Sequence, residues 1–498
     1  MPRFTVSFFL IGISALSSHA AVIRGTVTEQ RTGYVLSRTA VTLEPVPSAG
    51  QQVRTARTGQ NGQFVFGNVT AGSYLLKASH RGFLPVQYGQ KRWDAAGAVI
   101  IVIGDEVITV DLPMHRYGAI AGTVRDSNEV GIPDQDVAAY TSSQPPVFVT
   151  RGESDDRGVF RIGGLEPGTY LVRTTGGNDD ERSYLPSFSR QTLRVEEARP
   201  ILVYPDEDTL DGDVRPIEGR LFMLTGSAPL PLPGSFFVTV TLASDLGRAY
   251  SNGPAFRFPA LAPGHYELYA EARENPPGTR VLGGYTDLLI ERNISNFALP
   301  MNEIRETRFV LDGAGLGSTA SALVRRKDYA GTGEVQNVVL NATTGISLLP
   351  GHWEVQIVAP RGYYVSHFGG PRNAVSRPDG WNDVLIGSSG FVSATLSNGP
   401  AALHGVVRDS AKPIPGAPVF LEGWDPVTRN RLIDPRETRS DARGNYRFDN
   451  LAPGDYRILS TFDYAAPNPQ IFDASRANEI RLEKATDPAV DLELSGNP

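Results

Sequence analysis

Short runs in which apolar and polar residues alternate fill most of this chain, and turn residues separate the runs. In the run at 160–165, Phe160 and Ile162 alternate with polar or small neighbours, and Leu165 closes the run. A period of two places alternate side chains on one face, as in a half-buried β-strand. The residues before this run, DDRG at 155–158, are a tight-turn signal. The pattern therefore predicts short strands joined by tight turns and almost no helix.

One strand–turn–strand phrase recurs five times along the chain. It reads FVFGNVTAGSY at 64–74, FRIGGLEPGTY at 160–170, FRFPALAPGHY at 256–266 and YRFDNLAPGDY at 446–456, with a shortened form, LLPGHW, at 348–353. The closing aromatic residues of successive copies lie 96, 96, 87 and 103 residues apart. A period of about 95 residues is too long for one unit of a solenoid and fits one small domain. We therefore expect about five homologous modules in tandem.

Each copy of the phrase places a glycine two residues before its closing aromatic residue. The pairs are Gly72 and Tyr74, Gly168 and Tyr170, Gly264 and Tyr266, Gly351 and Trp353, and Gly454 and Tyr456. The Pro167-Gly168 dipeptide predicts a type II turn, in which the glycine takes a positive φ. We expect the aromatic ring to lie in the core and its polar group to bond to the backbone. These ten residues are therefore predicted to have structural roles.

The number of predicted strands sets the fold class. About seven short strands in each repeat suit a small antiparallel sandwich. We predict an all-β chain made of about five small antiparallel, Greek-key-like β-sandwiches. A closing alternating run, such as 107–112, comes before the first junction and serves to place it. The expected sandwiches span residues 21–116, 117–205, 206–312, 313–398 (a degenerate copy) and 399–498.

The order of these features resembles the carboxypeptidase regulatory-like domain. The last repeat carries the pattern at 405–409, 415–417, 441–446 and 451–456. The first two repeats match well, the third keeps 219–221 and 263–266, and the fourth keeps only 350–353. The resemblance implies a transthyretin-like (prealbumin-like), carbohydrate-binding-like sandwich, in arrays similar to those of secreted bacterial proteins. It also implies that the module is an accessory domain rather than a catalytic one.

The first twenty residues read as a secretory signal peptide. Arg3 precedes an apolar stretch at 4–16, and the small residues Ser18 and Ala20 fit a cleavage site after Ala20. No later apolar run reaches the roughly 18 residues of a spanning helix. We therefore expect an exported protein (periplasmic, extracellular or on the outer surface) without a membrane span. The net charge is −7 and the basic residues are scattered, so the sequence predicts no basic patch for nucleic acid. The absence of cysteine excludes disulfides.

The sequence gives little support for catalysis or for a cofactor. Neither His265 nor His352 belongs to a metallopeptidase ligand pattern, because the glutamate that follows each is one residue too near. We expect both to be solvated turn residues and predict no metal site. No Gly-x-Ser-x-Gly elbow is present. The acidic run at 206–213 leaves two interpretations open, a calcium site built from oxygen ligands or a solvated linker.

Aromatic residues outside the alternating pattern are the candidate binding residues. Two tyrosines follow their module's motif tyrosine by fourteen residues, in loops that contain further aromatic residues. The full set is Tyr88, Trp93, Tyr184, Phe188, Tyr363, Tyr364, Trp381 and Trp424. Exposed rings can stack on sugar rings while polar neighbours bind the hydroxyls. The alternative is that these rings cover the ends of the sandwiches or pack between modules.

These observations favour a secreted, non-catalytic, multi-module binding or adhesion protein, with a polysaccharide or a cell-envelope component as partner. One alternative is a purely structural spacer or cell-envelope scaffold, which the short junctions at 115–118 and 397–400 suit. A third is a hydrolase whose site is assembled between modules.

Overall fold

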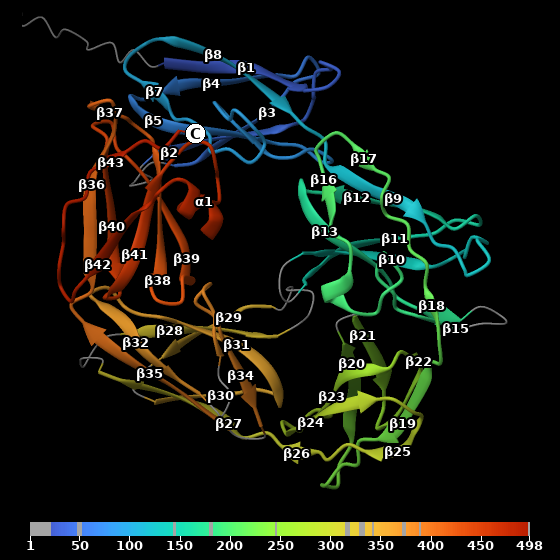
Figure 1. Ribbon diagram of the computed structural model, residues 1–498. Helices are drawn as coiled ribbons and strands as arrows, with labels where there is room; N and C mark the ends of the chain where they lie inside the picture. Colours follow the sequence, from blue (N-terminus) through green and yellow to red (C-terminus); the bar gives the residue numbers. More distant parts are fainter. Residues whose placement is uncertain are drawn as a thin grey trace, which may run out of the picture. The chain divides into compact units, whose positions relative to one another are not determined.

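The computed structural model describes residues 21–46, 52–142, 146–178, 183–244, 247–313, 319–327, 334–340, 343–370, 375–387 and 390–496. The predicted signal peptide lies outside this range. The described chain is nearly all strand and loop, with one α-helix, α1 (Pro469–Ala474), and one 3-10 helix, η1 (Val195–Glu197) (Figure 1). Neither of these helices has the length and apolar character needed to cross a bilayer. The all-β prediction is confirmed.

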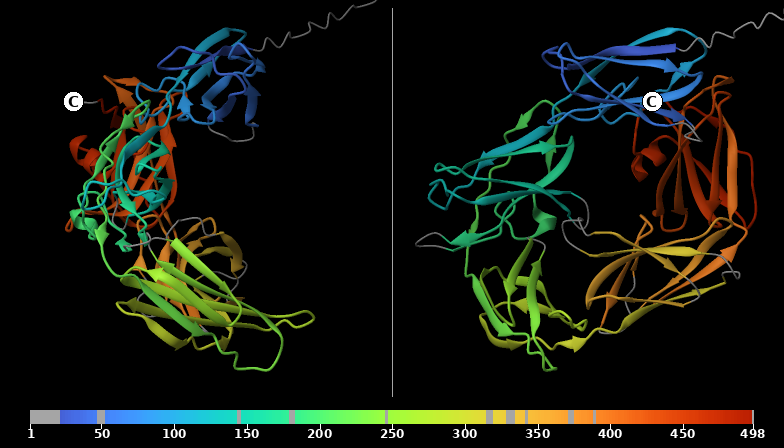
Figure 2. Two further views of the ribbon diagram at one scale, coloured as in Figure 1. Left: turned by 90° about the vertical axis from the view of Figure 1, so that its right-hand side faces the viewer. Right: turned by 180° about the vertical axis from the view of Figure 1, so that it is seen from behind.

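The described strands form eleven sheets, which we group by strand order into modules one to five, with two sheets in each module and a small third sheet in module two. Figure 2 gives two further views of them. Module one comprises residues 21–114, module two 118–218, module three 222–303, module four 306–398 and module five 401–493. Module one, without residues 82–84, is one compact unit of the chain, and the remainder is the other.

Module one shows the plan that the other modules repeat. Its strands are β1 (Ala21–Glu29), β2 (Ala40–Val46), β3 (Arg54–Arg57), β4 (Gln63–Val69), β5 (Gly72–Ser79), β6 (Val86–Gln87), β7 (Ile100–Val102) and β8 (Val107–Met114). One sheet has the order β4-β1-β8 and the other β3-β2-β5-β6, with β7 also paired to β5. Strand β1 is antiparallel to β4 but parallel to the closing strand β8.

Module two adds a small third sheet to this plan. Its strands are β9 (Gly118–Thr123), β10 (Asp136–Thr141), β11 (Phe148–Glu153), β12 (Val159–Leu165), β13 (Gly168–Thr174), β14 (Gly177–Asn178), β15 (Ser183–Leu185), β16 (Ile201–Val203), β17 (Asp208–Thr209) and β18 (Ile217–Glu218). The sheets are β12-β9-β17, β11-β10-β13-β16 and β14-β15-β18.

Module three has its longest strands in the second sheet. Its strands are β19 (Phe222–Ser227), β20 (Phe236–Ser244), β21 (Gly247–Asn252), β22 (Ala255–Leu261), β23 (Gly264–Glu274), β24 (Val281–Ile290), β25 (Ile294–Ala298) and β26 (Asn302–Glu303). The sheets are β22-β19-β25 and β21-β20-β23-β24-β26.

Module four, the degenerate repeat, keeps the same arrangement. Its strands are β27 (Glu306–Asp312), β28 (Ala320–Arg326), β29 (Gln336–Leu340), β30 (Thr343–Ser347), β31 (Gly351–Val358), β32 (Tyr363–Gly369), β33 (Val375–Ser376), β34 (Asn382–Ile386) and β35 (Gly390–Asn398). The sheets are β30-β27-β35-β32 and β29-β28-β31-β34-β33.

Module five contains the helix α1, which follows its motif strand. Its strands are β36 (Ala401–Asp409), β37 (Lys412–Pro413), β38 (Pro418–Asp425), β39 (Asn430–Arg439), β40 (Asn445–Leu451), β41 (Gly454–Ser460), β42 (Asn478–Leu482) and β43 (Leu492–Glu493). The first sheet is β37-β36-β40 with β43 also on β36, and the second is β39-β38-β41-β42. Asn468 caps α1 by accepting a hydrogen bond from the Ile471 amide at 2.9 Å, and Pro469 occupies its first turn.

The strand pairings move two of the predicted module boundaries. β17 pairs with β9, so residues 208–209, placed in the third sandwich by the expected boundary at 205, belong to module two. β27 pairs with β30 and β35, so residues 306–312, which were also assigned to the third sandwich, belong to module four. Both errors arise because a strand near a junction alternates in the same way whether it closes one module or opens the next.

The motif aromatic residue is anchored in the same way in every module. Its ring is buried, and its polar group donates to the carbonyl oxygen four residues earlier in the chain. The bonds run from Tyr74 to Thr70 at 2.9 Å, Tyr170 to Glu166 at 2.8 Å, Tyr266 to Ala262 at 2.9 Å, Trp353 Nε1 to Leu349 at 2.8 Å and Tyr456 to Ala452 at 2.6 Å. Burial raises the pKa of the Tyr456 phenol to about 12. The ring therefore fills the core without leaving its polar group unpaired.

The left-handed residue of the phrase lies four positions before the predicted one. Gly168 has φ 159°, at the edge of the extended region, and begins β13, so the predicted type II turn is wrong. Gly164, with φ 76°, is the left-handed residue, and the register of β12 against β9 shifts between Gly163 and Leu165. This shift is a β-bulge, which adds one residue and turns Leu165 back into the core.

The bulge position gives a testable substitution pair. The equivalent residues in three other modules are Asn68, Ala260 and Asn450, with φ of 53°, 56° and 61°. We expect Gly164→Asn to leave stability almost unchanged, because asparagine adopts left-handed backbone readily. Gly164→Val should cost about 1–2 kcal/mol, because a β-branched side chain is strained there. Urea unfolding followed by circular dichroism would compare them, and equal midpoints for the two variants would contradict the assignment.

A glycine of the first strand lies opposite the first aromatic residue of the phrase in four modules. The pairs are Gly25 with Phe64, Gly122 with Phe160, Gly226 with Phe256 and Gly405 with Tyr446. A Cβ on Gly405 would lie 1.8 Å from the Val490 carbonyl oxygen and 3.0 Å from the Tyr446 ring. At Gly405, therefore, only glycine leaves room for both the Val490 carbonyl of the closing segment and the Tyr446 ring to approach the first strand.

Candidate functional site

The loop after β6 in module one carries the most exposed ring among the predicted binding residues. Trp93 is 37% exposed, whereas Trp424 is 2% exposed. The side chain of Gln90 fastens this loop, since its Nε2 donates to the Ala95 carbonyl at 2.8 Å and its Oε1 accepts from the Gln87 amide at 2.6 Å. The loop therefore holds Trp93 on an ordered backbone.

Charged residues flank Trp93 in the sequence. Arg92 and Asp94, on either side of it, form an ion pair with a closest approach of 2.5 Å. Lys91 is exposed nearby, and Tyr88 is half-buried at the start of the loop. An accessible indole ring beside charged hydrogen-bonding groups is the arrangement that sugar stacking needs.

The structure places the two predicted binding residues of module two inside the protein. Tyr184 is 2% exposed and belongs to the main core, while Phe188 is 5% exposed and belongs to a smaller cluster. The Arg173 guanidinium covers the Phe188 ring at 4.9 Å. These rings fill the sandwich end, so neither presents a face on which a sugar can stack.

Trp424 in module five is also buried, over an ionic network. The Arg457 guanidinium lies 3.5 Å from its ring centroid, and Arg457 donates to Glu422, whose side chain is fully buried. Nε of Arg457 is 2.7 Å from Oε1 of Glu422, and Arg431 binds the other carboxylate oxygen at 2.6 Å. Arg457 also binds Asp473 of α1 at 2.6 Å. Trp424 therefore packs over this network and has no face available to a ligand.

Module four separates its three aromatic candidates between two sheets. Tyr363 and Tyr364 begin β32, whereas Trp381 precedes β34 of the other sheet. All three are half-buried. The Arg325 guanidinium already lies over the Trp381 ring at 4.2 Å. They do not form one platform, although each keeps a partly exposed surface.

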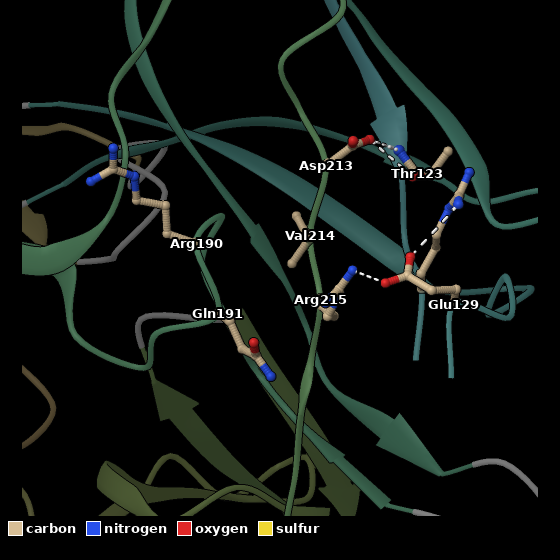
Figure 3. A pocket seen from close by; sticks show the side chains of 8 residues that line it. Thr123, Glu129, Arg190, Gln191, Asp213, Val214 and Arg215 are labelled. Carbon is tan, nitrogen blue, oxygen red and sulfur yellow. Dashed lines mark hydrogen bonds and ion pairs between the residues drawn. The ribbon is translucent and has the colours of Figure 1, made fainter. Parts of the chain in front are cut away.

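A polar hollow of about 490 Å³ opens in module two (Figure 3). Its lining residues mostly bind one another: Glu129 pairs with Arg215 and lies 3.8 Å from Arg125. Asp213 accepts from the amide and hydroxyl of Thr123 at 2.8 and 2.9 Å. Figure 3 shows Arg190 pointing away from this group. The hollow contains no aromatic ring, and its charges do not converge on a common point.

A second hollow, of about 650 Å³, lies in module five beside β36 and β40. His404 and Arg447 at its edge both bind Asp487, at 2.8 and 3.0 Å. These two hydrogen bonds hold the pKa of Asp487 below its ordinary value. Tyr446, which also lines the hollow, donates to the Val490 carbonyl at 2.5 Å. The groups are again paired internally.

The acidic run at 206–213 is distributed among separate partners. Asp206 accepts from His115 at 2.6 Å, Asp208 from Arg161 at 2.9 Å and Asp211 from Arg199 at 2.5 Å. The fourth, Asp213, belongs to the hollow of module two. Because the four aspartates are used at different places, they do not gather oxygen ligands around one point.

Several exposed tyrosines were missed by the sequence reasoning. Tyr34, Tyr204 and Tyr250 are 72%, 52% and 64% exposed. They do not stand at a fixed offset from the repeated phrase, which was the basis of the prediction. The Thr32-Gly33 pair before Tyr34 is a turn signal in the sequence and could have indicated an exposed position. Gly33 has φ 71° in the structure.

The comparisons with known proteins bear on the fold. Residues 22–110 match the family model of the carboxypeptidase regulatory-like domain. Comparison with curated proteins gives no match. Among solved structures, the minor pilin GBS52 of Streptococcus agalactiae is 13% identical, with 43% of this chain and 100% of that chain covered and a TM-score of 0.26. The shaft pilin SpaA of Lactobacillus rhamnosus GG is 11% identical, with coverages of 40% and 98% and a TM-score of 0.24.

The TIE protein of Bacillus anthracis is similar over more of the chain, with 95% of this chain and 74% of that chain covered at 10% identity and a TM-score of 0.18. Similarities this low say nothing about activity or partners. The family match has more weight, because it coincides with one of the repeats defined by the phrase. The resemblance read from the sequence is thus confirmed, and residues 22–110 of module one carry the carboxypeptidase regulatory-like domain pattern.

Proposed function

We propose that this protein is an exported, non-catalytic, multi-module binding protein and that the Trp93 loop of module one contacts carbohydrate. The observation that carries the proposal is Trp93 itself, 37% exposed beside the Arg92–Asp94 ion pair on a loop fastened by Gln90. Stacking buries the apolar face of the indole ring, while the charged neighbours bind hydroxyl groups.

Binding at one loop would be weak. A stacked ring contributes about 0.5–1.5 kcal/mol beyond its buried area. Further partly exposed rings, such as Tyr364 and Trp381 in module four, would add contacts on a long polymer. Linked sites raise overall affinity when they engage one ligand together, so a polysaccharide fits better than a short sugar.

A spacer is the second candidate. Module four begins at residue 306, soon after module three ends at 303, and such short junctions favour a rigid array. A spacer would need no ligand, and its exposed rings would then contribute nothing to binding.

The Trp93→Ala variant tests the proposal. We expect its apparent affinity for the bound polysaccharide to fall about tenfold, because the stacking face is lost. Trp93→Phe should keep most of the binding, because a ring remains. Pull-down with insoluble polysaccharides and fluorescence titration with soluble ones would measure both, with circular dichroism as the folding control. Equal binding by the wild type and a folded Trp93→Ala variant would remove this loop from the site.

A further inference from the structure

Three side chains of the types that bind metal ions come together where module four contacts module three, away from the Trp93 loop. They are Glu267 on β23, Asp287 on β24 and His352 on β31. One carboxylate oxygen from each acid and one ring nitrogen of the histidine lie within 4.8 Å of one another. Nε2 of His352 is 3.8 Å from Oε1 of Glu267. The sequence had predicted a solvated turn for His352, but its ring is only partly exposed.

The register of the sheet gives an independent reason to expect a cation there. Glu267 and Asp287 are direct cross-strand partners on β23 and β24. Directly opposite residues project from the same face, where two like charges repel and weaken the strand pair. A cation between the carboxylates would replace this repulsion with attraction. The Tyr285 hydroxyl donates to Asp287 at 2.7 Å and orients that carboxylate.

The shortened phrase of module four, residues 348–353, contains His352. A Cβ on Gly283 of β24 would lie 2.6 Å from Pro350, and one on Gly351 would lie 3.3 Å from the Tyr285 ring. The His352 ring meets the Tyr285 ring edge-on, with centroids 5.8 Å apart. The Pro-Gly-His segment therefore packs directly on β24, and this packing fixes the imidazole beside the two carboxylates.

Charged neighbours influence which ion fits. The Arg326 guanidinium lies 3.8 Å from the Tyr269 ring centroid and donates to the Pro350 carbonyl at 3.1 Å. Its positive charge acts on Glu267, and Arg248 also lies near enough to act on Arg326. These arginines weaken binding of any cation. An ion that gains strongly from an imidazole ligand is therefore favoured over Mg²⁺ or Ca²⁺, which prefer oxygen ligands.

We propose that Glu267, Asp287 and His352 bind a divalent cation of the zinc class and that this ion joins module three to module four. Zn²⁺ accepts nitrogen and carboxylate ligands in a tetrahedral arrangement, with three protein ligands and water as a common set. Ligand atoms around Zn²⁺ lie about 3.3 Å apart at the usual bond lengths, so small side-chain movements would close the site. The ion would tie β31 of one module to the β23–β24 pair of the other.

Zinc titration of the full mature chain tests this site. Protein stripped with EDTA would be titrated with ZnCl2 by calorimetry, and its melting temperature would be followed with and without the metal. We expect saturable binding of one zinc ion and a higher melting temperature in zinc. MgCl2 should produce neither effect.

The control is a second histidine at the same position of the motif. His265 is exposed on β23 and does not belong to the group, so His265→Ala should bind zinc as the wild type does. His352→Ala and Asp287→Asn should lose both the saturable binding and the thermal shift. Asp287 is exposed, so its variant should fold even if His352→Ala does not. Absence of zinc binding by the wild type, or undiminished binding by a folded Asp287→Asn variant, would overturn the proposal.

Discussion

Replacing Glu422 with glutamine should destabilise module five by about 3–5 kcal/mol. The Glu422 side chain is fully buried and the Arg457 side chain is 3% exposed, so removal of the carboxylate charge leaves a buried guanidinium with its main partner gone. The glutamine amide keeps one acceptor oxygen, so it can accept from Arg457 or from Arg431 but not from both, and its NH2 group faces the other guanidinium. Hydrogen exchange of the β38 and β41 amides, together with calorimetry, would measure the loss.

Two comparisons sharpen this expectation. Asp455→Asn breaks a surface pair in the same sheet, with Arg481 74% exposed, and should cost under about 1 kcal/mol. A double variant, Glu422→Leu with Arg457→Leu, should recover much of the stability, because apolar residues of similar size can replace a buried ion pair. A Glu422→Gln variant as stable as Asp455→Asn would mean that the buried network is not held as described.

Gly405→Ala should be the most damaging single-methyl change in module five, at about 3 kcal/mol or more. The new Cβ would lie 1.8 Å from the Val490 carbonyl oxygen, so the closing segment would have to leave β36. Because the obstacle is backbone, no side-chain rotation relieves it. Chemical denaturation with circular dichroism would follow the loss, and amide exchange near Leu492 would show whether β43 is released.

Gly454→Ala is the matched control for this variant. Gly454 belongs to the repeated phrase of the same module, but a Cβ there meets only the Tyr456 ring, at an ordinary 3.8 Å. We expect a change within about 1 kcal/mol. Equal effects at the two glycines would contradict the close-approach explanation of Gly405.

The repeated phrase made most of the fold predictable from the sequence. Alternation at Phe160 and Ile162 predicted a strand with one buried face, and both side chains are in the core. The position of the left-handed residue was not predictable in the same way. Asn68, Gly164 and Asn450 are of types that adopt left-handed backbone readily, but Ala260 is not. Pro167-Gly168 carries a stronger turn signal, and it is misleading.

The parallel pairing of first and closing strands was also not predictable. It follows from chain segments about 85 residues apart, such as Gly25 and Val110, meeting in one sheet. A local pattern gives the existence of each strand but not its partner. The role of Gly405 becomes clear only once that partner is known.

The candidate site was less predictable than the fold, because the sequence around an aromatic residue in a loop does not show whether its ring is exposed or buried. Trp93 is exposed, while Trp424 at a similarly polar stretch lies under Arg457. The arginine that packs on Trp424 is itself bound by Asp473 of helix α1, about 50 residues further along the chain. The sequence signal for that helix is Asn468 followed by Pro469, a favourable N-cap residue and a proline suited to the first helical turn.

Binding of a protein comprising residues 21–498 to an array of polysaccharides, oligosaccharides and peptidoglycan fragments tests the proposed function most directly. We predict saturable binding to at least one polymeric class, much weaker binding to its short oligomers, and a marked loss in the Trp93→Ala variant. Equal, background-level signal for every glycan, from a protein with the expected β-sheet circular dichroism spectrum, would contradict carbohydrate binding and favour the spacer.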